Sequence, residues 1–133
     1  MDLSIIIAHY DPGNHSSCIE SFHQTLQKIE SQKEDYKIEV IIADDGSVTH
    51  QDIQSIGSQL TDTDERSIYH LKGDILLNWK QENHFNYSSI SHWLYLPKNE
   101  PMMSKARICN AAIAITSSDN LFFLDDDVFL CHS

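Results

Sequence analysis

The sequence predicts an α/β fold in which a mostly parallel sheet carries helices on both faces. Two apolar runs rich in β-branched residues, 3–8 and 38–43, each fit a strand that is buried on both faces. Apolar residues at helical spacing separate the two runs, and a second helical pattern follows them. This β-α-β-α order favours parallel strands that are covered by helices.

The first half of the chain supports this order element by element. After the strand over 3–8, a turn containing Pro-Gly leads into a helix over 16–32, which opens with the capping-box spacing Ser-Cys-Ile-Glu. The strand over 38–43 ends at Asp-Asp-Gly-Ser, and a short helix follows. The apolar face of that short helix is expected to hold Ile53, Ile56 and Leu60.

The second half of the chain is less regular. Residues 67–79 fit one or two short strands, and residues 80–92 show no clear periodicity, so we interpret 67–92 as an excursion from the sheet. A strand is expected over 92–97, where a proline ends it. A helix over 104–117 and a last strand over 121–124 complete the pattern.

Composition narrows the classes of partner. The chain of 133 residues has 9 basic and 20 acidic side chains, a net charge of −11, which disfavours nucleic acid and anionic membranes as partners. A phosphate ligand remains compatible if a metal ion bridges it to carboxylates. The cysteines form no C-x-x-C pair, and reduced thiols in the cytosol are the simple interpretation. No glycine-rich nucleotide motif of the dinucleotide or P-loop type occurs.

Two acidic clusters follow apolar strands. Asp44 and Asp45 come after 38–43, and Asp125, Asp126 and Asp127 come after 121–124. If both strands belong to one parallel sheet, their aspartates share the carboxyl edge, where α/β folds bind ligands. Mg²⁺ or Mn²⁺ is a natural counter-charge for such carboxylates, although acidic turns without a ligand are a common alternative. His9 and His132 are further possible ligands, and each is more often a core or surface residue.

Four stretches, in this order, resemble the family 2 glycosyltransferases with the GT-A fold. They are LSIIIAHYD, EVIIADDGS, LYLPKNEPMMSKARICNAAI and LFFLDDDVF. The first is similar to the family's opening strand and nucleotide-contacting turn, and the last to the strand that bears the Asp-x-Asp metal motif. The resemblance implies a Rossmann-like GT-A nucleotide-binding sheet in a single domain over 1–133, with an insertion at about 67–92.

The resemblance also implies a set of site residues. Asp45 is expected to contact the nucleotide base, and Asp127 together with Asp125 is expected to ligate the Mn²⁺ or Mg²⁺ that holds the donor diphosphate. The full nucleotide-sugar site that it implies consists of Ala8, His9, Tyr10, Asp44, Asp45, Lys105, Asp125 and Asp126.

The implied function is sugar transfer from a nucleoside-diphosphate sugar, with a UDP-sugar as the first choice, to a hydroxyl of a saccharide or glycolipid. In this family the acceptor-binding half and the catalytic base follow the metal motif. We therefore expect this chain to be the donor-binding half, truncated after Asp-x-Asp, and no catalytic base is assigned. We further expect a cytoplasmic protein of polysaccharide biosynthesis, peripheral at the inner membrane face in its full-length form, with self-association as an option.

Two other classes stay open on sequence grounds. A signalling receiver domain is also α/β, acidic and Mg²⁺-binding, but its acidic pair follows the first strand rather than the second. A non-catalytic nucleotide-binding or oligomerisation module would keep the fold and bind nucleotide without turnover.

Overall fold

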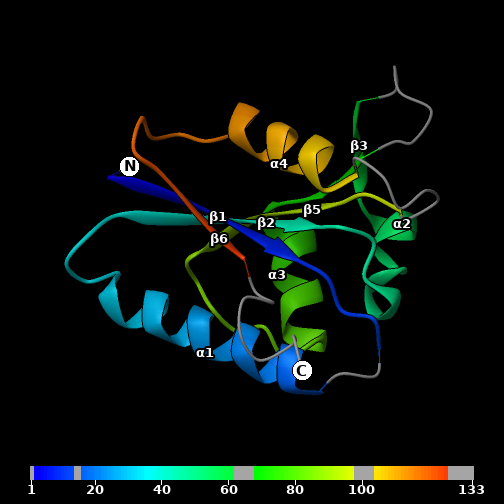
Figure 1. Ribbon diagram of the computed structural model, residues 1–133, viewed down its shortest axis with the longest axis horizontal. Coiled ribbons are helices and arrows are strands. Elements are labelled where there is room, and N and C mark those ends of the chain that lie inside the picture. Colours follow the sequence, from blue (N-terminus) through cyan, green and yellow to red (C-terminus); the bar gives the residue numbers. More distant parts are fainter. Residues whose placement is uncertain (1, 14–15, 62–67, 98–103, 126–133) are drawn as a thin grey trace.

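The computed structural model describes residues 2–13, 16–61, 68–97 and 104–125, which form a six-stranded sheet with helices on both faces (Figure 1). The elements are β1 (Leu3–His9), α1 (Ser16–Gln32), β2 (Ile38–Asp44), the 3₁₀ turn η1 (Val48–His50), α2 (Ile53–Ile56), β3 (Ser58–Thr61), β4 (Ile68–Leu71), α3 (Gly73–Glu82), β5 (Ile90–Tyr95), α4 (Ser104–Ala114) and β6 (Leu121–Asp125). Within these ranges, none of the helices is both long and apolar enough to span a bilayer.

The sheet is mixed, which corrects the prediction of a mostly parallel one. Its strand order is β3-β4-β5-β2-β1-β6. Strands β5, β2, β1 and β6 run parallel, whereas β3 and β4 are antiparallel to their neighbours. Only residues 62–67 join β3 to β4, which is too short for the crossover that parallel neighbours require.

The segment 67–92 contains one of the expected short strands, but that strand belongs to the main sheet, and a helix that was not expected follows it. Its first part forms β4, which pairs with β5, and the following run Asp-Ile-Leu-Leu-Asn-Trp is helical. Leu76, Trp79 and Lys80 recur at helical spacing and are buried, so α3 presents one face to the core. The short helix predicted before this segment ends at Ile56, and Leu60 lies in β3 instead.

Alternate residues of the central strands enter two cores. Ile5 and Ile7 of β1 pack on the face covered by α1 and α3, whereas Ile6 packs on the face covered by α4 (Figure 1). The first core is rich in aromatic rings and the second contains small residues of α4, among them Ala112. Both faces of β1 and β2 are therefore buried, as their continuous apolar runs predicted.

The strand register brings the acidic strand ends to one edge. Ala8 of β1 is paired with Ala43 on one side and with Asp125 on the other, and His9 is paired with Asp44. Neighbouring strands lie about 4.8 Å apart, so the ends of β2 and β6 are roughly 10 Å from each other across β1. The expected common edge is confirmed for Asp44 and Asp125, whereas Asp126 and Asp127 lie outside the described residues.

Strand β6 forms one edge of the sheet and is poorly covered. The side chains of Phe122 and Phe123 are 56% and 51% exposed. Exposed apolar edge strands favour pairing with another chain. The expectation of self-association is compatible with this edge and stays a prediction.

Candidate functional site at the carboxyl edge

Two turns interlock where β1 and β2 end. The Asp11 backbone N–H donates to Ser47 Oγ at 2.8 Å, and the Val48 N–H donates to the carbonyl of Asp11 at 2.9 Å. The Thr49 hydroxyl adds a hydrogen bond to Asp11 Oδ2 at 2.7 Å. Gly46 has a φ of 74°, a backbone conformation that residues with a Cβ rarely adopt. These contacts fix the Asp-Asp-Gly-Ser turn against the end of the first strand.

A cavity of about 360 Å³ opens beside these turns, and we call it the carboxyl-edge cavity. Tyr95 ends β5 and the other lining residues follow β1, β2 or β5, so the cavity lies at the carboxyl ends of three parallel strands. They combine aromatic, amide and backbone groups: Tyr10, Gly46, Val48, Gln51, Gln54, Tyr95 and Pro97. Such a lining suits a polar ligand that carries a flat ring.

Tyr95 connects the cavity to the core. Its hydroxyl donates to the carbonyl of Ser47 at 3.1 Å. Burial, together with the negative charge of Asp44, raises the pKa of Tyr95 to about 12. The phenol therefore stays neutral and holds the turn after β2 in place.

Asp44 faces the core rather than the cavity, which differs from its expected role in nucleotide binding. It is fully buried, and its Oδ2 accepts hydrogen bonds from His50 Nδ1 at 2.9 Å and from Trp93 Nε1 at 3.1 Å. The Ser47 backbone N–H donates to Oδ1 at 2.9 Å. Burial raises the pKa of Asp44, but the hydrogen bonds and the neighbouring His9 and His50 outweigh burial and hold the pKa below its usual value.

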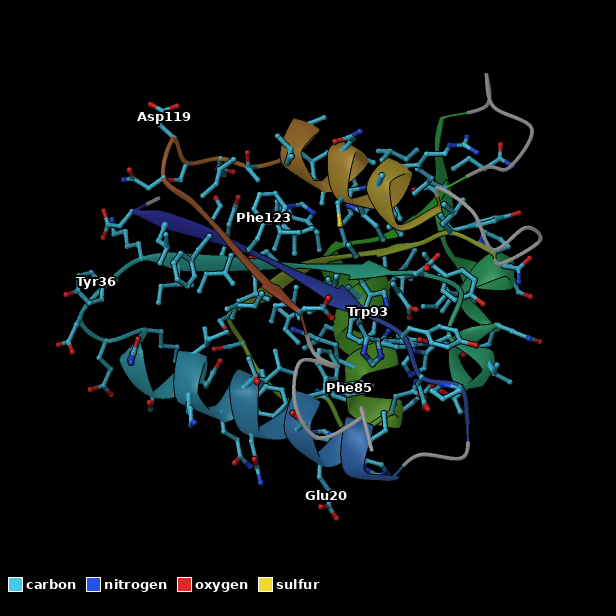
Figure 2. All side chains as sticks on the ribbon, viewed as in Figure 1. Glu20, Tyr36, Phe85, Trp93, Asp119 and Phe123 are labelled. Carbon is cyan, nitrogen blue, oxygen red and sulfur yellow. The ribbon has the colours of Figure 1, made fainter. Side chains whose placement is uncertain are left out.

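His9 also points into the core. Its ring is 2% exposed and stacks on Phe22, with ring centroids 4.0 Å apart and an interplanar angle of 14°. Side chains along a strand point alternately to its two faces. His9, two positions after Ile7, therefore points into the same aromatic core as Ile7. Figure 2 shows Trp93 and Phe85 in the same layer, between the sheet and helices α1 and α3.

His9, Asp44 and His50 form a buried group that could hold a metal ion. One donor atom from each residue lies within 4.8 Å of the other two. All three residues are buried. This group is distinct from the expected Asp-x-Asp site, because its ligands come from the ends of β1 and β2 and from η1.

The remaining predicted site residues lie at or near the carboxyl edge. Tyr10 lines the cavity, and Asp45, which is 9% exposed, precedes the lining residue Gly46. Ala8 is buried at the end of β1. Asp125 is half-buried at the end of the edge strand β6. Lys105 belongs to the first turn of α4, and its side chain is outside the described part of the chain.

Sequence reasoning missed the cavity residues that follow the second strand. Gln51 and Gln54 are three positions apart, which places both amides on one side of the helical segment after η1. His50 was also missed, although its position six residues after Asp44 allows a return contact across the turn. Tyr95 was missed as well, because its neighbour in space, Ser47, is distant in sequence.

A second hollow, which we call the α2–α3 groove, has a volume of about 380 Å³. Its wall is largely apolar and comes from helices α2 and α3: Ile56, Ile75, Asn78, Trp79 and Glu82. The indole of Trp79 donates to Asp52 Oδ2 at 3.1 Å. None of the residues expected to bind nucleotide lines this groove.

Comparisons with known proteins leave the family open. The chain matches no protein-family model, no curated protein and no solved structure. The assignment of function therefore depends on the carboxyl-edge geometry and on the motifs in the sequence.

Proposed function

We propose that the chain binds the nucleoside diphosphate of a sugar donor at its carboxyl edge, as the donor-binding part of a glycosyltransferase. The carboxyl-edge cavity carries this proposal, because it lies beside Asp45 and outside the ends of β1, β2 and β5. Ligands of open α/β sheets bind at this position. The motif resemblance supplies the class of ligand.

The cavity lining suits a nucleobase. Tyr10 offers an aromatic ring for stacking, and the amides of Gln51 and Gln54 offer both donors and acceptors. Asp45, beside the cavity, would accept from a base N–H, as the resemblance implies. A uracil base fits this combination, which supports UDP as the nucleotide.

The diphosphate would lie between the cavity and β6. Strand order reverses at β1, because β2 and β5 lie on one side of it and β6 on the other. Asp125 ends β6 beside Ala8, at this switch point. Asp125 and Asp127 would hold a divalent cation there, and the cation would stabilise the negative charge that grows on the leaving diphosphate.

The mixed sheet also argues against a receiver domain. Receiver-type folds of the flavodoxin class are doubly wound parallel sheets, whereas β3 and β4 run antiparallel here. In addition, the buried Asp44 has its oxygens committed to His50, Trp93 and Ser47.

Calorimetry with UDP tests the proposal. We expect micromolar or weaker binding that requires Mn²⁺ or Mg²⁺, and a loss of at least tenfold in affinity for Asp127→Ala. Asp119→Ala is the matched control, because it removes an exposed carboxylate at the opposite end of β6 (Figure 2). Equal binding by both variants, or binding without metal, would count against the assignment. Hydrolysis of a UDP-sugar by the bound chain would then separate an enzyme from a binding module.

A further inference from the structure

We propose that His9, Asp44 and His50 bind a transition-metal ion of the zinc class inside the fold, behind the carboxyl-edge cavity. The three donor atoms lie within 4.8 Å of one another and are all buried. They come from three separate segments, the ends of β1 and β2 and the 3₁₀ turn η1. Folding alone therefore brings together two imidazoles and one carboxylate.

The donor chemistry selects the class of metal. Two imidazole nitrogens and one carboxylate oxygen suit Zn²⁺, Co²⁺, Fe²⁺ or Ni²⁺, whereas Mg²⁺ prefers oxygen ligands alone. His50 Nδ1 and Asp44 Oδ2 are 2.9 Å apart. Since metal–ligand bonds of these ions are about 2.0–2.1 Å long, neighbouring ligand atoms lie roughly 3 Å from each other. The pair is thus already near the spacing of two ligands, and the donor atom of His9 lies within 4.8 Å of both.

A second pair of histidines, His70 and His92, lacks, in the described part of the chain, the third donor that Asp44 supplies to His9 and His50. His70 Nε2 and His92 Nδ1 lie 2.9 Å apart on the face covered by α4. The nearby carboxylate, Glu39, is engaged elsewhere, because its Oε1 accepts from Ser4 Oγ and from the Ser117 N–H. These two rings pair with each other and lack a third converging ligand among the described residues.

A metal at this site would have a structural consequence for the cavity. Each of the three ligands comes shortly before a residue that lines the cavity. Tyr10 comes after His9, and Gly46 comes soon after Asp44. Gln51 follows His50 directly. A bound ion would therefore join the three segments that shape the cavity wall and hold them in one arrangement.

Titration of the full chain with Co²⁺ tests the proposal. The two tryptophans of the chain, Trp79 and Trp93, have ring centroids 5.1 Å and 5.5 Å from that of His50. Bound Co²⁺ should quench their fluorescence at one equivalent, give visible absorption bands, and be displaced by Zn²⁺. We expect His9→Gln and His50→Gln each to weaken Co²⁺ binding at least tenfold, whereas His92→Gln should bind as the wild type does.

Three results would overturn the proposal: no quenching of the wild-type chain, quenching that persists unchanged in His9→Gln, or quenching that His92→Gln removes. Thermal unfolding of the wild-type chain gives a second test that needs no variant to fold. Zn²⁺ should raise the midpoint by several degrees, and Mg²⁺ at the same concentration should not. An absent shift with Zn²⁺, or an equal shift with Mg²⁺, would contradict the site.

Discussion

The carboxyl-edge cavity and the α2–α3 groove have similar volumes, about 360 and 380 Å³, but they are built from different parts of the fold. The first gathers residues that follow three parallel strands, and its wall is polar and aromatic. The second lies between two helices and is walled by Ile56, Ile75 and Trp79 beside two polar side chains. Volume alone therefore does not distinguish the two hollows, and the proposal of a ligand site at the carboxyl edge depends on its position at the strand ends and on the chemistry of its lining.

The two hollows also differ in what supports them. Each is associated with a tryptophan indole that donates to an aspartate at 3.1 Å: Trp93 donates to Asp44, which comes shortly before the cavity residue Gly46, and the groove residue Trp79 donates to Asp52. Asp44 is fully buried and also holds His50, whereas Asp52 is exposed. A buried carboxylate with several donors contributes far more to stability than an exposed one, because its removal leaves those donors without a partner.

The largest expected effect concerns this pair of aspartates. Asp44→Asn should lower the free energy of unfolding by about 3 kcal/mol, because the change removes the buried charge that pairs with His50. Asp52→Asn should cost about 1 kcal/mol or less. Urea denaturation followed by tryptophan fluorescence, in the presence of a chelator, measures both. Equal losses would show that the two hollows are supported alike.

The next effect concerns ligand binding. Val48 and Ile75 are branched residues of similar exposure, 49% and 52%, and each lines one hollow. Val48→Trp should fill the carboxyl-edge cavity and weaken UDP binding at least tenfold, about 1.4 kcal/mol. Ile75→Trp fills the α2–α3 groove and should leave UDP binding unchanged in the same calorimetric titration. Weaker UDP binding by Ile75→Trp and unchanged binding by Val48→Trp would indicate that UDP binds in the α2–α3 groove instead.

The smallest expected effect is the pH dependence of stability that His70 and His92 cause, which should leave ligand binding unchanged. Burial lowers the pKa of His70 to about 4, helped by His92 and Lys72, and burial lowers the pKa of His92 although Glu39 raises it. Below the ordinary pKa of 6.5 the unfolded chain binds more protons at these rings than the folded chain does. The contribution that these two histidines make to the free energy of unfolding is therefore fully present above pH 6.5 and declines as the pH falls toward 4.

Denaturation at a series of pH values checks this expectation. His70→Gln should flatten the dependence of unfolding free energy on pH between 6.5 and 4. UDP affinity at pH 7.5 should stay that of the wild type, because the pair lies on the α4 face and outside the cavity. A variant with an unchanged pH dependence would show that other groups produce it.

Much of the fold could be predicted because its signals are local. The helix over 16–32 and strands β1 and β2 follow from apolar spacing, and the structure has them at these residues within one position, whereas β5 is shifted by two. Helix α3 was not predicted because Leu76, Trp79 and Lys80, which form its core face, lie amid polar neighbours. Strand direction also escaped prediction, since it depends on the short connection between β3 and β4.

The edge that holds the candidate site was predictable, but the direction in which its side chains point was not. Aspartates after apolar strands indicate the carboxyl edge, and the register of Ala8 with Asp125 confirms that edge. Adjacent residues of a strand point to opposite faces, so Asp44 turns inward next to Asp45. Only the three-dimensional contacts with His50 and Trp93 reveal which aspartate belongs to the core.

The most direct test is the mapping of UDP and Mg²⁺ onto the amide resonances of the wild-type chain by NMR titration. The account predicts that the amides of Tyr10, Gly46, Gln51 and Gln54 shift together and saturate with one affinity, while Ile75 and Glu82 of the α2–α3 groove stay in place. Shifts confined to the groove, or no shifts at millimolar UDP with Mg²⁺ present, would contradict a nucleotide site at the carboxyl edge.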